Sequence, residues 1–165
     1  MRSSPARLAW GVLPGVIASL AWGCKAPSPA PGPPEAVVPA YFTSPDTVLQ
    51  GMPFSEAVQV GNLLFVSGQI GSVPGTLSLA PGGIGPESRQ ALENIRAILE
   101  RRGAALADVV KCTIFLADIS EWGAFNKVYR EFFSPPYPAR SALGGTALVF
   151  GARTEVECIA VVPGS

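Results

Sequence analysis

The chain has 165 residues, of which 48% are apolar and only 15% charged, so wholesale disorder is excluded and one domain with appendages is expected. Twelve Lys and Arg residues balance twelve Asp and Glu residues. There is no histidine, which excludes Ser-His-Asp triads, Cys-His dyads, helical HExxH zinc sites and imidazole general bases. Three widely spaced cysteines without a CxxC pair also exclude a zinc ribbon and do not suggest a disulfide framework.

Residues 1–24 have the order of a secretory signal: two arginines, an apolar run over 8–20, and then small residues. The run is shorter than the ~20 residues that a membrane-spanning helix needs. It ends in LAWGC, which resembles the bacterial lipobox, although Leu20 lies one position farther from the cysteine than usual. We expect a lipoprotein-like signal, a lipid anchor on Cys24 and a place in the bacterial cell envelope (periplasm or membrane-anchored). The alternatives are an ordinary signal peptide, or a mis-assigned start codon before a cytoplasmic protein.

Residues 25–47 are predicted to be a linker, because six prolines between Pro27 and Pro39 favour an extended polyproline spacer. Residues 48–165 are then the folded domain. From residue 40 onward, nine Lys and Arg against eleven Asp and Glu give a net charge of −2. This part of the sequence has no basic run, so nucleic acid is not expected as a partner.

The first half of the domain predicts a hairpin, a loop and a helix. Residues 58–67 indicate two short strands around Gly61-Asn62. Residues 71–86 are rich in Gly and Pro and indicate a surface loop without a P-loop or dinucleotide signature. A helix is predicted from Pro86 to Gly103 because apolar residues recur at three- and four-residue spacing, namely Ala91, Leu92, Ile95, Ile98 and Leu99.

The second half predicts a strand, a helix and two further strands. Residues 108–117 are rich in β-branched side chains, as is typical of a strand. A second helix is expected to begin near Asp118 or Ser120 and to end before Pro135. Residues 140–148 and 154–162 indicate the last two strands. The apolar stripe of the second helix, which we expect in the core, consists of Trp122, Phe125, Val128, Tyr129 and Phe132.

The order β-β-α-β-α-β-β predicts an α+β fold of two layers, with both helices on one face of a mixed sheet. The last strand alternates between a helix-facing side and a second side that is half acidic and half aliphatic. Aliphatic residues on a helix-free face imply that another subunit covers it. The second side carries Glu155, Glu157, Ile159 and Val161.

Three features are candidates for chemistry because they lie where strands meet loops. Arg140 can bind a carboxylate through two parallel hydrogen bonds, and Glu155 can act as a general acid or base. Residues 67–69 lead from the hairpin into the Gly-rich loop. The alternative is a surface arginine paired with a glutamate at the rim. Cys112 and Cys158 are expected to be buried free thiols, bonded only if they are adjacent in an oxidising compartment.

Six segments in order resemble the RidA/YjgF family of reactive intermediate deaminases, over about residues 48–162. They are SGQI (67–70), ALENIRAILERRG (91–103), DVVKCTIFLAD (108–118), NKVYREFF (126–133), YPARSA (137–142) and EVECIAVV (155–162). The resemblance implies a chorismate-mutase-like homotrimer with clefts between subunits. It also implies hydrolysis of small 2-imino acids, or their enamine tautomers, to 2-keto acids and ammonia, without a metal or organic cofactor.

Position by position, the resemblance gives Arg140 the role of binding the substrate carboxylate and Glu155 that of holding the attacking water. The remaining substrate-binding positions that it implies are Ser67, Gly68, Asn126, Phe54 and Ala142. Two of these depart from the family pattern, which has tyrosine at Phe54 and frequently cysteine at Ala142. Glu56 stands where the pattern has glutamine.

Two other readings remain open at this point. One is a non-catalytic trimeric module of the cell envelope that binds small carboxylates or acts like a chaperone; it would keep Arg140 but would not need Glu155. The other, a ribonuclease, fits poorly with a net-negative domain without histidine. Glu157 is expected to have a structural or interface role rather than to form a carboxylate dyad with Glu155.

Overall fold

The structure is a computed structural model that describes residues 11, 36–145 and 147–164. The predicted signal, the lipidation site Cys24 and most of the predicted linker lie outside the described residues. Among the helices that are described, none combines the length and the apolar character needed to cross a membrane.

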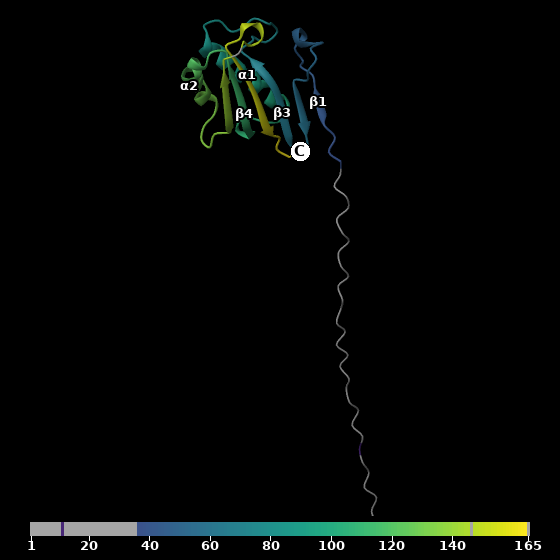
Figure 1. Ribbon diagram of the computed structural model, residues 1–165. Coiled ribbons are helices and arrows are strands. Elements are labelled where there is room, and N and C mark those ends of the chain that lie inside the picture. Colours follow the sequence, from purple (N-terminus) through teal and green to yellow (C-terminus); the bar gives the residue numbers. More distant parts are fainter. Residues whose placement is uncertain (1–10, 12–35, 146, 165) are drawn as a thin grey trace, which may run out of the picture. The chain divides into compact units, whose positions relative to one another are not determined.

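The domain is built on a six-stranded sheet with the strand order β1-β2-β3-β6-β4-β5 (Figure 1). All neighbouring strands are antiparallel except β4 and β5, which run parallel, so the sheet is mixed as predicted. The strands are β1 (Ala40–Phe42), β2 (Ala57–Val60), β3 (Leu63–Ile70), β4 (Val109–Leu116), β5 (Ala139–Gly144) and β6 (Thr154–Val161).

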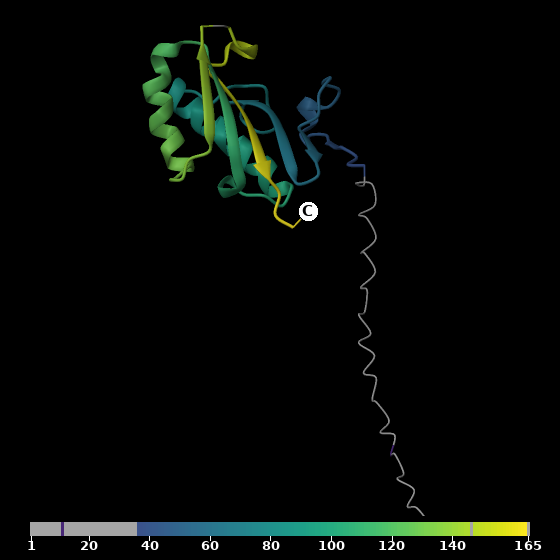
Figure 2. The same ribbon diagram turned by 60° about the horizontal axis from the view of Figure 1, so that its bottom comes forward.

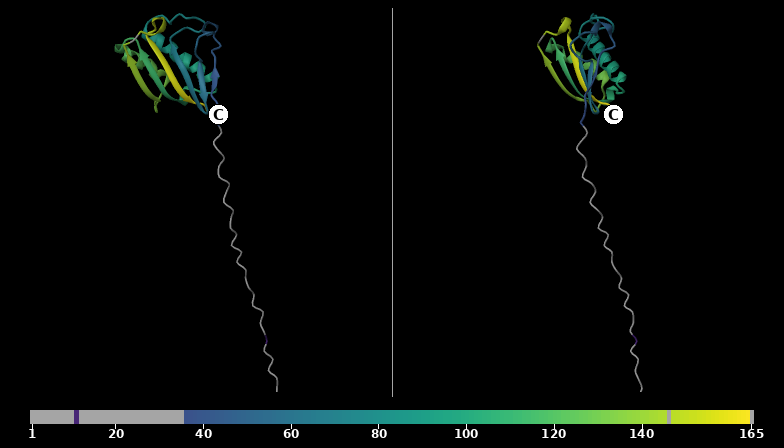
Figure 3. Two further views of the ribbon diagram at one scale, coloured as in Figure 1. Left: turned by 45° about the vertical axis from the view of Figure 1, so that its right-hand side comes forward. Right: turned by 90° about the vertical axis from the view of Figure 1, so that its right-hand side faces the viewer.

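Two helices, α1 (Ile84–Arg101) and α2 (Trp122–Phe132), cover one face of this sheet (Figures 2 and 3). Their buried side chains share one core with the inward-facing residues of β3, β4 and β6, among them Leu64, Ile114 and Val156. The predicted α+β class, with both helices on one face, is therefore confirmed. The other face carries no helix, and Leu63 and Phe65 of β3 are 37% and 41% exposed on it.

The helix boundaries follow from local hydrogen bonding. At the end of α1, the Ala104 N–H donates to the Leu99 carbonyl at 2.9 Å and the Gly103 N–H donates to that of Glu100 at 3.2 Å, which closes the last turn. Before α2, the Asp118 side chain accepts from the Ser120 N–H at 2.8 Å and caps a short turn. The first helix begins two residues earlier than predicted, at Ile84.

The core prediction is confirmed for α1, where all five residues of the apolar stripe are buried. In α2, Phe125, Val128 and Tyr129 are buried, but Trp122 is 46% exposed, so its assignment to the core was wrong. The physical reason is its place at the first residue of α2, where its ring lies near the Arg140 side chain instead of the sheet.

Two boundaries of the folded part differ from the predicted ones. Strand β1 pairs with β2 although it lies within residues 25–47, so ordered structure begins before residue 48. Strand β5 ends at Gly144 rather than at residue 148, because Gly145 adopts a φ of 98° and turns the chain away. A short turn, Val149–Gly151, then leads toward β6.

Cys112 and Cys158 form a disulfide, which corrects the expectation of free thiols. The antiparallel register of β4 and β6 places the two residues directly opposite each other, and both are buried as predicted. The burial of both cysteines could be predicted from the sequence, whereas the register between β4 and β6 could not. The bond ties together the neighbouring strands β4 and β6.

Loss of this disulfide is expected to lower the free energy of unfolding. The bond joins residues 46 positions apart, for which the chain-entropy model gives about 4 kcal/mol. Urea unfolding of the full chain should show a lower midpoint when reductant is present throughout. The double variant Cys112→Ala/Cys158→Ala should give the same midpoint with and without reductant. If the native chain also gave the same midpoint under both conditions, the disulfide assignment would be contradicted.

Candidate active site

The carboxylate of Glu155 lies in a cavity of about 360 Å³ between β3, β6 and the loops beside them, which we call the glutamate pocket. Three other predicted site residues, Phe54, Ser67 and Gly68, line the same pocket. The structure therefore brings four of the predicted positions together, although they come from three separate stretches of the sequence.

An irregularity in β3 creates the floor of this pocket. The register with β6 shifts between Val66 and Gln69, which takes Ser67 and Gly68 out of the regular ladder. A Cβ atom on Gly68 would lie 1.9 Å from Oε1 of Glu155, so only glycine leaves room for the carboxylate at this place. The Gln69 side chain donates from Nε2 to the carbonyls of Ser67 and Gly68, both at 3.1 Å, and holds the irregular segment in place.

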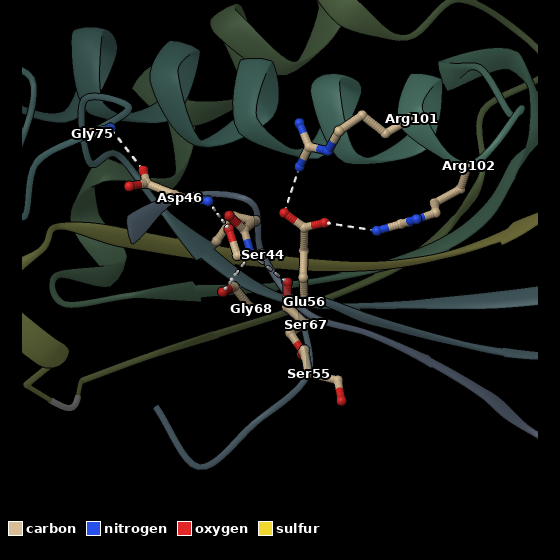
Figure 4. Close-up of polar contacts among 10 residues, drawn as sticks. Ser44, Asp46, Ser55, Glu56, Ser67, Gly68, Gly75, Arg101 and Arg102 are labelled. Carbon is tan, nitrogen blue, oxygen red and sulfur yellow. Dashed lines mark hydrogen bonds and ion pairs between the residues drawn. The ribbon is translucent and has the colours of Figure 1, made fainter. Parts of the chain in front are cut away.

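The wall that carries Phe54 is fixed to this floor by hydrogen bonds. The Ser67 hydroxyl donates to the Ser55 carbonyl at 2.6 Å (Figure 4). The next residue, Glu56, is buried and forms ion pairs with Arg101 at 2.5 Å and Arg102 at 3.6 Å, both at the end of α1 (Figure 4). The two arginines compensate the negative charge of Glu56. This explains why a glutamate can stand where the family pattern has glutamine.

Burial raises the pKa of Glu155, and the nearby negative charge of Glu157 raises it further. A carboxylate with a raised pKa is a stronger base toward a bound water than an ordinary one. Glu157 itself is exposed and does not line the glutamate pocket, so its charge acts on Glu155 from outside the site.

Arg140 lies in a second cavity, of about 270 Å³, which we call the arginine pocket. Its guanidinium carbon is 4.7 Å from the ring centroid of Tyr129 and 5.9 Å from that of Trp122. Among the described residues, the guanidinium has no hydrogen bond and no ion pair. A cation held over aromatic rings without a carboxylate partner is available to an anionic ligand.

Two further side chains of α2 shape the arginine pocket. Asn126 is buried, lines the pocket and makes no side-chain hydrogen bond to the part of the chain described here. Burial raises the pKa of Tyr129 to about 12, although the charge of Arg140 opposes the shift. The phenol therefore stays neutral at physiological pH and supports Arg140 without competing for its charge.

Arg140 and Glu155 face opposite sides of the sheet within one chain. In the register, Arg140 pairs with Cys112, whereas Glu155 pairs with Phe115. Residues three apart on a strand point to opposite faces, and Arg140 contacts the helix side through Tyr129. Two strand spacings and three residues of offset put their Cα atoms about 14 Å apart. One small ligand cannot touch both groups of a single chain.

The predicted site residues therefore fall into two groups. One contains Phe54, Ser67, Gly68 and Glu155; the other contains Arg140 and Asn126. Ala142 is exposed on β5 and lines neither pocket. Arg140 and Glu155 of one chain therefore do not form the ion pair that was considered as the alternative.

Sequence reasoning missed several residues of both pockets. Trp122 and Tyr129 were assigned to the core alone, and nothing in the sequence pattern indicated that both line the pocket of Arg140. The apolar lining from Leu77 and Phe150 was missed because the first lies in a loop and the second follows a segment predicted as a strand. In the part of the chain that the structure describes, no group of three or more Cys, Asp or Glu residues is placed to hold a metal ion.

Comparison with known proteins gives a consistent set of relatives. The model of the family described as Endoribonuclease L-PSP matches residues 47–162. A 2-iminobutanoate/2-iminopropanoate deaminase of Dermatophagoides farinae is 44% identical over 110 residues, covering 67% of this chain and 86% of the relative. The protein of the same name from Capra hircus is 45% identical over 109 residues, covering 66% and 80%.

A solved structure shows the same fold. The crystal structure of RidA from the Antarctic bacterium Psychrobacter sp. matches with a TM-score of 0.65 and 40% sequence identity, covering 68% of this chain and 90% of that chain.

Replacement of Glu157 by glutamine is expected to lower the pKa of Glu155. The change removes one of the two causes of the raised pKa but leaves the larger one, burial, in place. An NMR titration of the Glu155 carboxyl carbon should therefore give a lower pKa in Glu157→Gln, still above the ordinary value of about 4.3. Glu131→Gln, on the exposed face of α2, serves as the control and should leave the titration of Glu155 unchanged.

Proposed function

Because the chain belongs to the Endoribonuclease L-PSP family, which includes RidA, we propose that it hydrolyses reactive 2-imino acids, or their enamine tautomers, to 2-keto acids and ammonia. The observation that carries the proposal is the Arg140 guanidinium, held over Tyr129 and Trp122 without an anionic partner among the described residues. The names of the curated relatives support the same reaction.

Arg140 binds the carboxylate of the substrate through two parallel, charge-assisted hydrogen bonds. The aromatic rings beneath the guanidinium limit its access to water, which strengthens the interaction. Asn126, with a free side-chain amide in the same pocket, is placed to complete the polar contacts of the substrate. These groups fix the position of the electrophilic carbon, and positioning supplies much of the acceleration in such a reaction.

Glu155 holds a water molecule and accepts its proton as the oxygen attacks the C=N carbon. The C–O bond forms, and the electron pair of the C=N bond moves to nitrogen. Glu155 then returns this proton to nitrogen, which gives a carbinolamine. Glu155 next takes the proton of the new hydroxyl group and passes it to the same nitrogen, so that the C–N bond breaks and ammonia leaves as the C=O bond forms. The raised pKa of Glu155 makes the group a stronger base than an ordinary carboxylate, as a group that takes and returns a proton requires. An imidazole is not required.

The site is completed by a second chain, since Arg140 and Glu155 of one chain face opposite sides of the sheet. A cyclic trimer, in which the arginine pocket of one subunit meets the glutamate pocket of the next, supplies both groups to each cleft. The exposed apolar side chains of the helix-free face, including Leu63, Phe65 and Leu143, support such an assembly.

Two alternative functions are less well supported than this proposal. A ribonuclease, the activity in the family description, needs a basic surface, whereas residues 40–165 carry a net charge of −2. A non-catalytic carboxylate-binding module would not require Glu155 to be partly buried beside Gly68 with a raised pKa.

The bacterial cell envelope is the location that we propose, through a lipid anchor on Cys24. The order of residues 1–24 supports export, and the Cys112–Cys158 disulfide supports an oxidising compartment, because such bonds are rare in the reducing cytosol.

Replacement of either group should abolish most of the activity. Arg140→Ala removes two charged hydrogen bonds, so kcat/KM should fall at least ~100-fold. Glu155→Gln removes the general base, for which a loss of ~10²–10⁴-fold in kcat is expected. The assay follows the decay of 2-iminopropanoate or 2-iminobutanoate generated in situ. The controls Arg89→Ala and Glu131→Gln, from an exposed ion pair, should keep the native rate.

Mixed oligomers distinguish a shared site from one within a single chain. Arg140→Ala and Glu155→Gln chains are unfolded together in equal amounts and refolded. Each cleft then has a one-half chance of an intact Glu155 side and a one-half chance of an intact Arg140 side, so about a quarter of the native activity should return in a cyclic assembly. A mixture as inactive as its two components would refute the shared site.

The lipid anchor is tested on the full chain in a bacterial host. Labelling with radioactive palmitate should mark the native protein and leave Cys24→Ala unlabelled. The labelled protein should also remain with the membrane fraction after a high-salt wash. Equal labelling of both proteins, or of neither, would exclude a lipidated Cys24.

A further inference from the structure

A third cavity, of about 320 Å³, lies between helix α1 and the segment that joins β1 to β2. We call it the α1 cavity. Gln69 lines both this cavity and the glutamate pocket, but Glu155, Ser67 and Gly68 line the glutamate pocket only. The α1 cavity is therefore a separate space, which the proposed reaction does not use.

One face of α1 forms a wall of this cavity. Asn94, Ala97, Ile98 and Arg101 line it, and their spacing of three and four residues places them on the same side of the helix. From Asn94 to Arg101 the helix rises about 10 Å. The wall is thus elongated, with a polar side chain at each end and apolar ones between them.

A negative charge lies at the end of the cavity where Asn94 is. There the Asn94 amide donates to the Ser72 carbonyl at 3.0 Å. In the same loop, the Gly75 N–H donates to Oδ2 of Asp46 at 2.7 Å, and Oδ1 accepts from the Val48 N–H at 3.2 Å. These bonds fix the Asp46 carboxylate, and each of its oxygens can accept a further hydrogen bond.

A positive charge lies at the other end. Figure 4 shows Asp46 and Gly75 toward one end of α1, and Arg101 with Glu56 toward the other. The Arg101 guanidinium donates to Oε1 of Glu56 through one nitrogen, and its side chain is 39% exposed. Its remaining N–H groups are available to an anion in the cavity.

Glu56 adds an acceptor that lacks a donor. The residue is buried and lines the α1 cavity, and its Oε2 has no hydrogen-bond partner in the described part of the chain. Oε2 lies 3.6 Å from the Arg102 guanidinium, which compensates its charge at a distance too long for a hydrogen bond. A buried oxygen in this state costs free energy, which a donor supplied by a ligand recovers.

The charges and the length together select the ligand. Because Arg102 compensates Glu56, the charges of Asp46 and Arg101 remain, and a zwitterion is complementary to them. The two charged groups of an amino acid are only about 2.5 Å apart, whereas those of an extended dipeptide are about 6 Å apart. With a hydrogen bond of about 2.8 Å at each end, the dipeptide spans the length of the wall and the amino acid does not.

The volume agrees with a dipeptide. At roughly 30 Å³ for each water-sized group, the cavity of about 320 Å³ holds about eleven such groups. This is the number of non-hydrogen atoms in alanyl-alanine. The cavity therefore fits a dipeptide with small side chains.

We propose that the α1 cavity binds a small zwitterionic dipeptide. Its ammonium group donates to the Asp46 carboxylate, and its carboxylate accepts from Arg101. The peptide N–H, which is next to the carboxylate end, donates to Glu56. The small apolar side chains pack against Leu49 and Ala97.

Isothermal titration calorimetry of the full chain with alanyl-alanine tests the ligand class. N-acetyl-alanyl-alanine lacks the ammonium group and alanyl-alanine amide lacks the carboxylate, so each should bind at least ~10-fold more weakly than alanyl-alanine. Alanine, which is too short to reach both ends, should show the same loss. Absence of binding, or equal affinity for the blocked dipeptides, would refute the proposal.

Variants of the two charged ends test the place of binding. Asp46→Asn and Arg101→Gln should each weaken the binding of alanyl-alanine at least ~10-fold. The matched controls should keep the native affinity. Asp108→Asn changes an aspartate that also accepts a backbone N–H, and Arg96→Gln changes an arginine of α1 that pairs with Glu93 outside the cavity.

A third variant does not remove a polar contact and so guards against a loss of folding. Ala97→Phe fills the α1 cavity from the helix and should also lower the affinity at least ~10-fold, with an unchanged circular dichroism spectrum. Native affinity in this variant would place the dipeptide elsewhere and overturn the inference.

Arg140→Ala separates the α1 cavity from the proposed substrate site. This variant should bind alanyl-alanine as the native chain does, because Arg140 does not line the α1 cavity. Loss of binding would assign the dipeptide to the arginine pocket and contradict the inference. These titrations use no imine, so their failure leaves the proposed function intact, and failure of the imine assay leaves the dipeptide site intact.

Discussion

The alternation of side chains along β4, β5 and β6 is the constraint on which the rest of this molecule depends. It turns Arg140 toward the helices and Glu155 toward the helix-free face. Within the described part of one chain, neither charged group has a partner of opposite charge in its pocket. The guanidinium has aromatic neighbours but no anion among the described residues, and the carboxylate is partly buried beside a like charge. Both properties are what a site shared between two subunits requires.

The structure around the two pockets maintains these unfavourable arrangements. The Gln69 side chain holds the irregular part of β3, and Glu56 anchors the wall of Phe54 through Arg101 and Arg102. The disulfide joins β4 to β6 on the helix-covered face, within the core. A partly buried carboxylate persists here because the core and these links fix the backbone around it, as they also do for Phe150, whose φ of 55° lies in the left-handed region.

Much of the fold followed from the sequence because periodicity is a local signal. The spacing of Ala91, Leu92 and Ile95 and the alternation in β6 identified the buried faces without any tertiary information. The exceptions have tertiary causes: Trp122 is a helix-initial residue drawn to Arg140, and the Cys112–Cys158 bond depends on a register between strands 46 residues apart. The site residues came from a resemblance of motifs, whereas their division between the two faces of the sheet required the structure.

The central claim is that one substrate is held by Arg140 of one chain and Glu155 of another. A crystal structure of the full assembly with a bound 2-keto acid, the product of the proposed reaction, tests it most directly. The account predicts a carboxylate within hydrogen-bonding distance of the Arg140 guanidinium, and a keto carbon facing the Glu155 carboxylate of the adjacent subunit. A product bound by groups of one chain only, or bound away from both pockets, would contradict it.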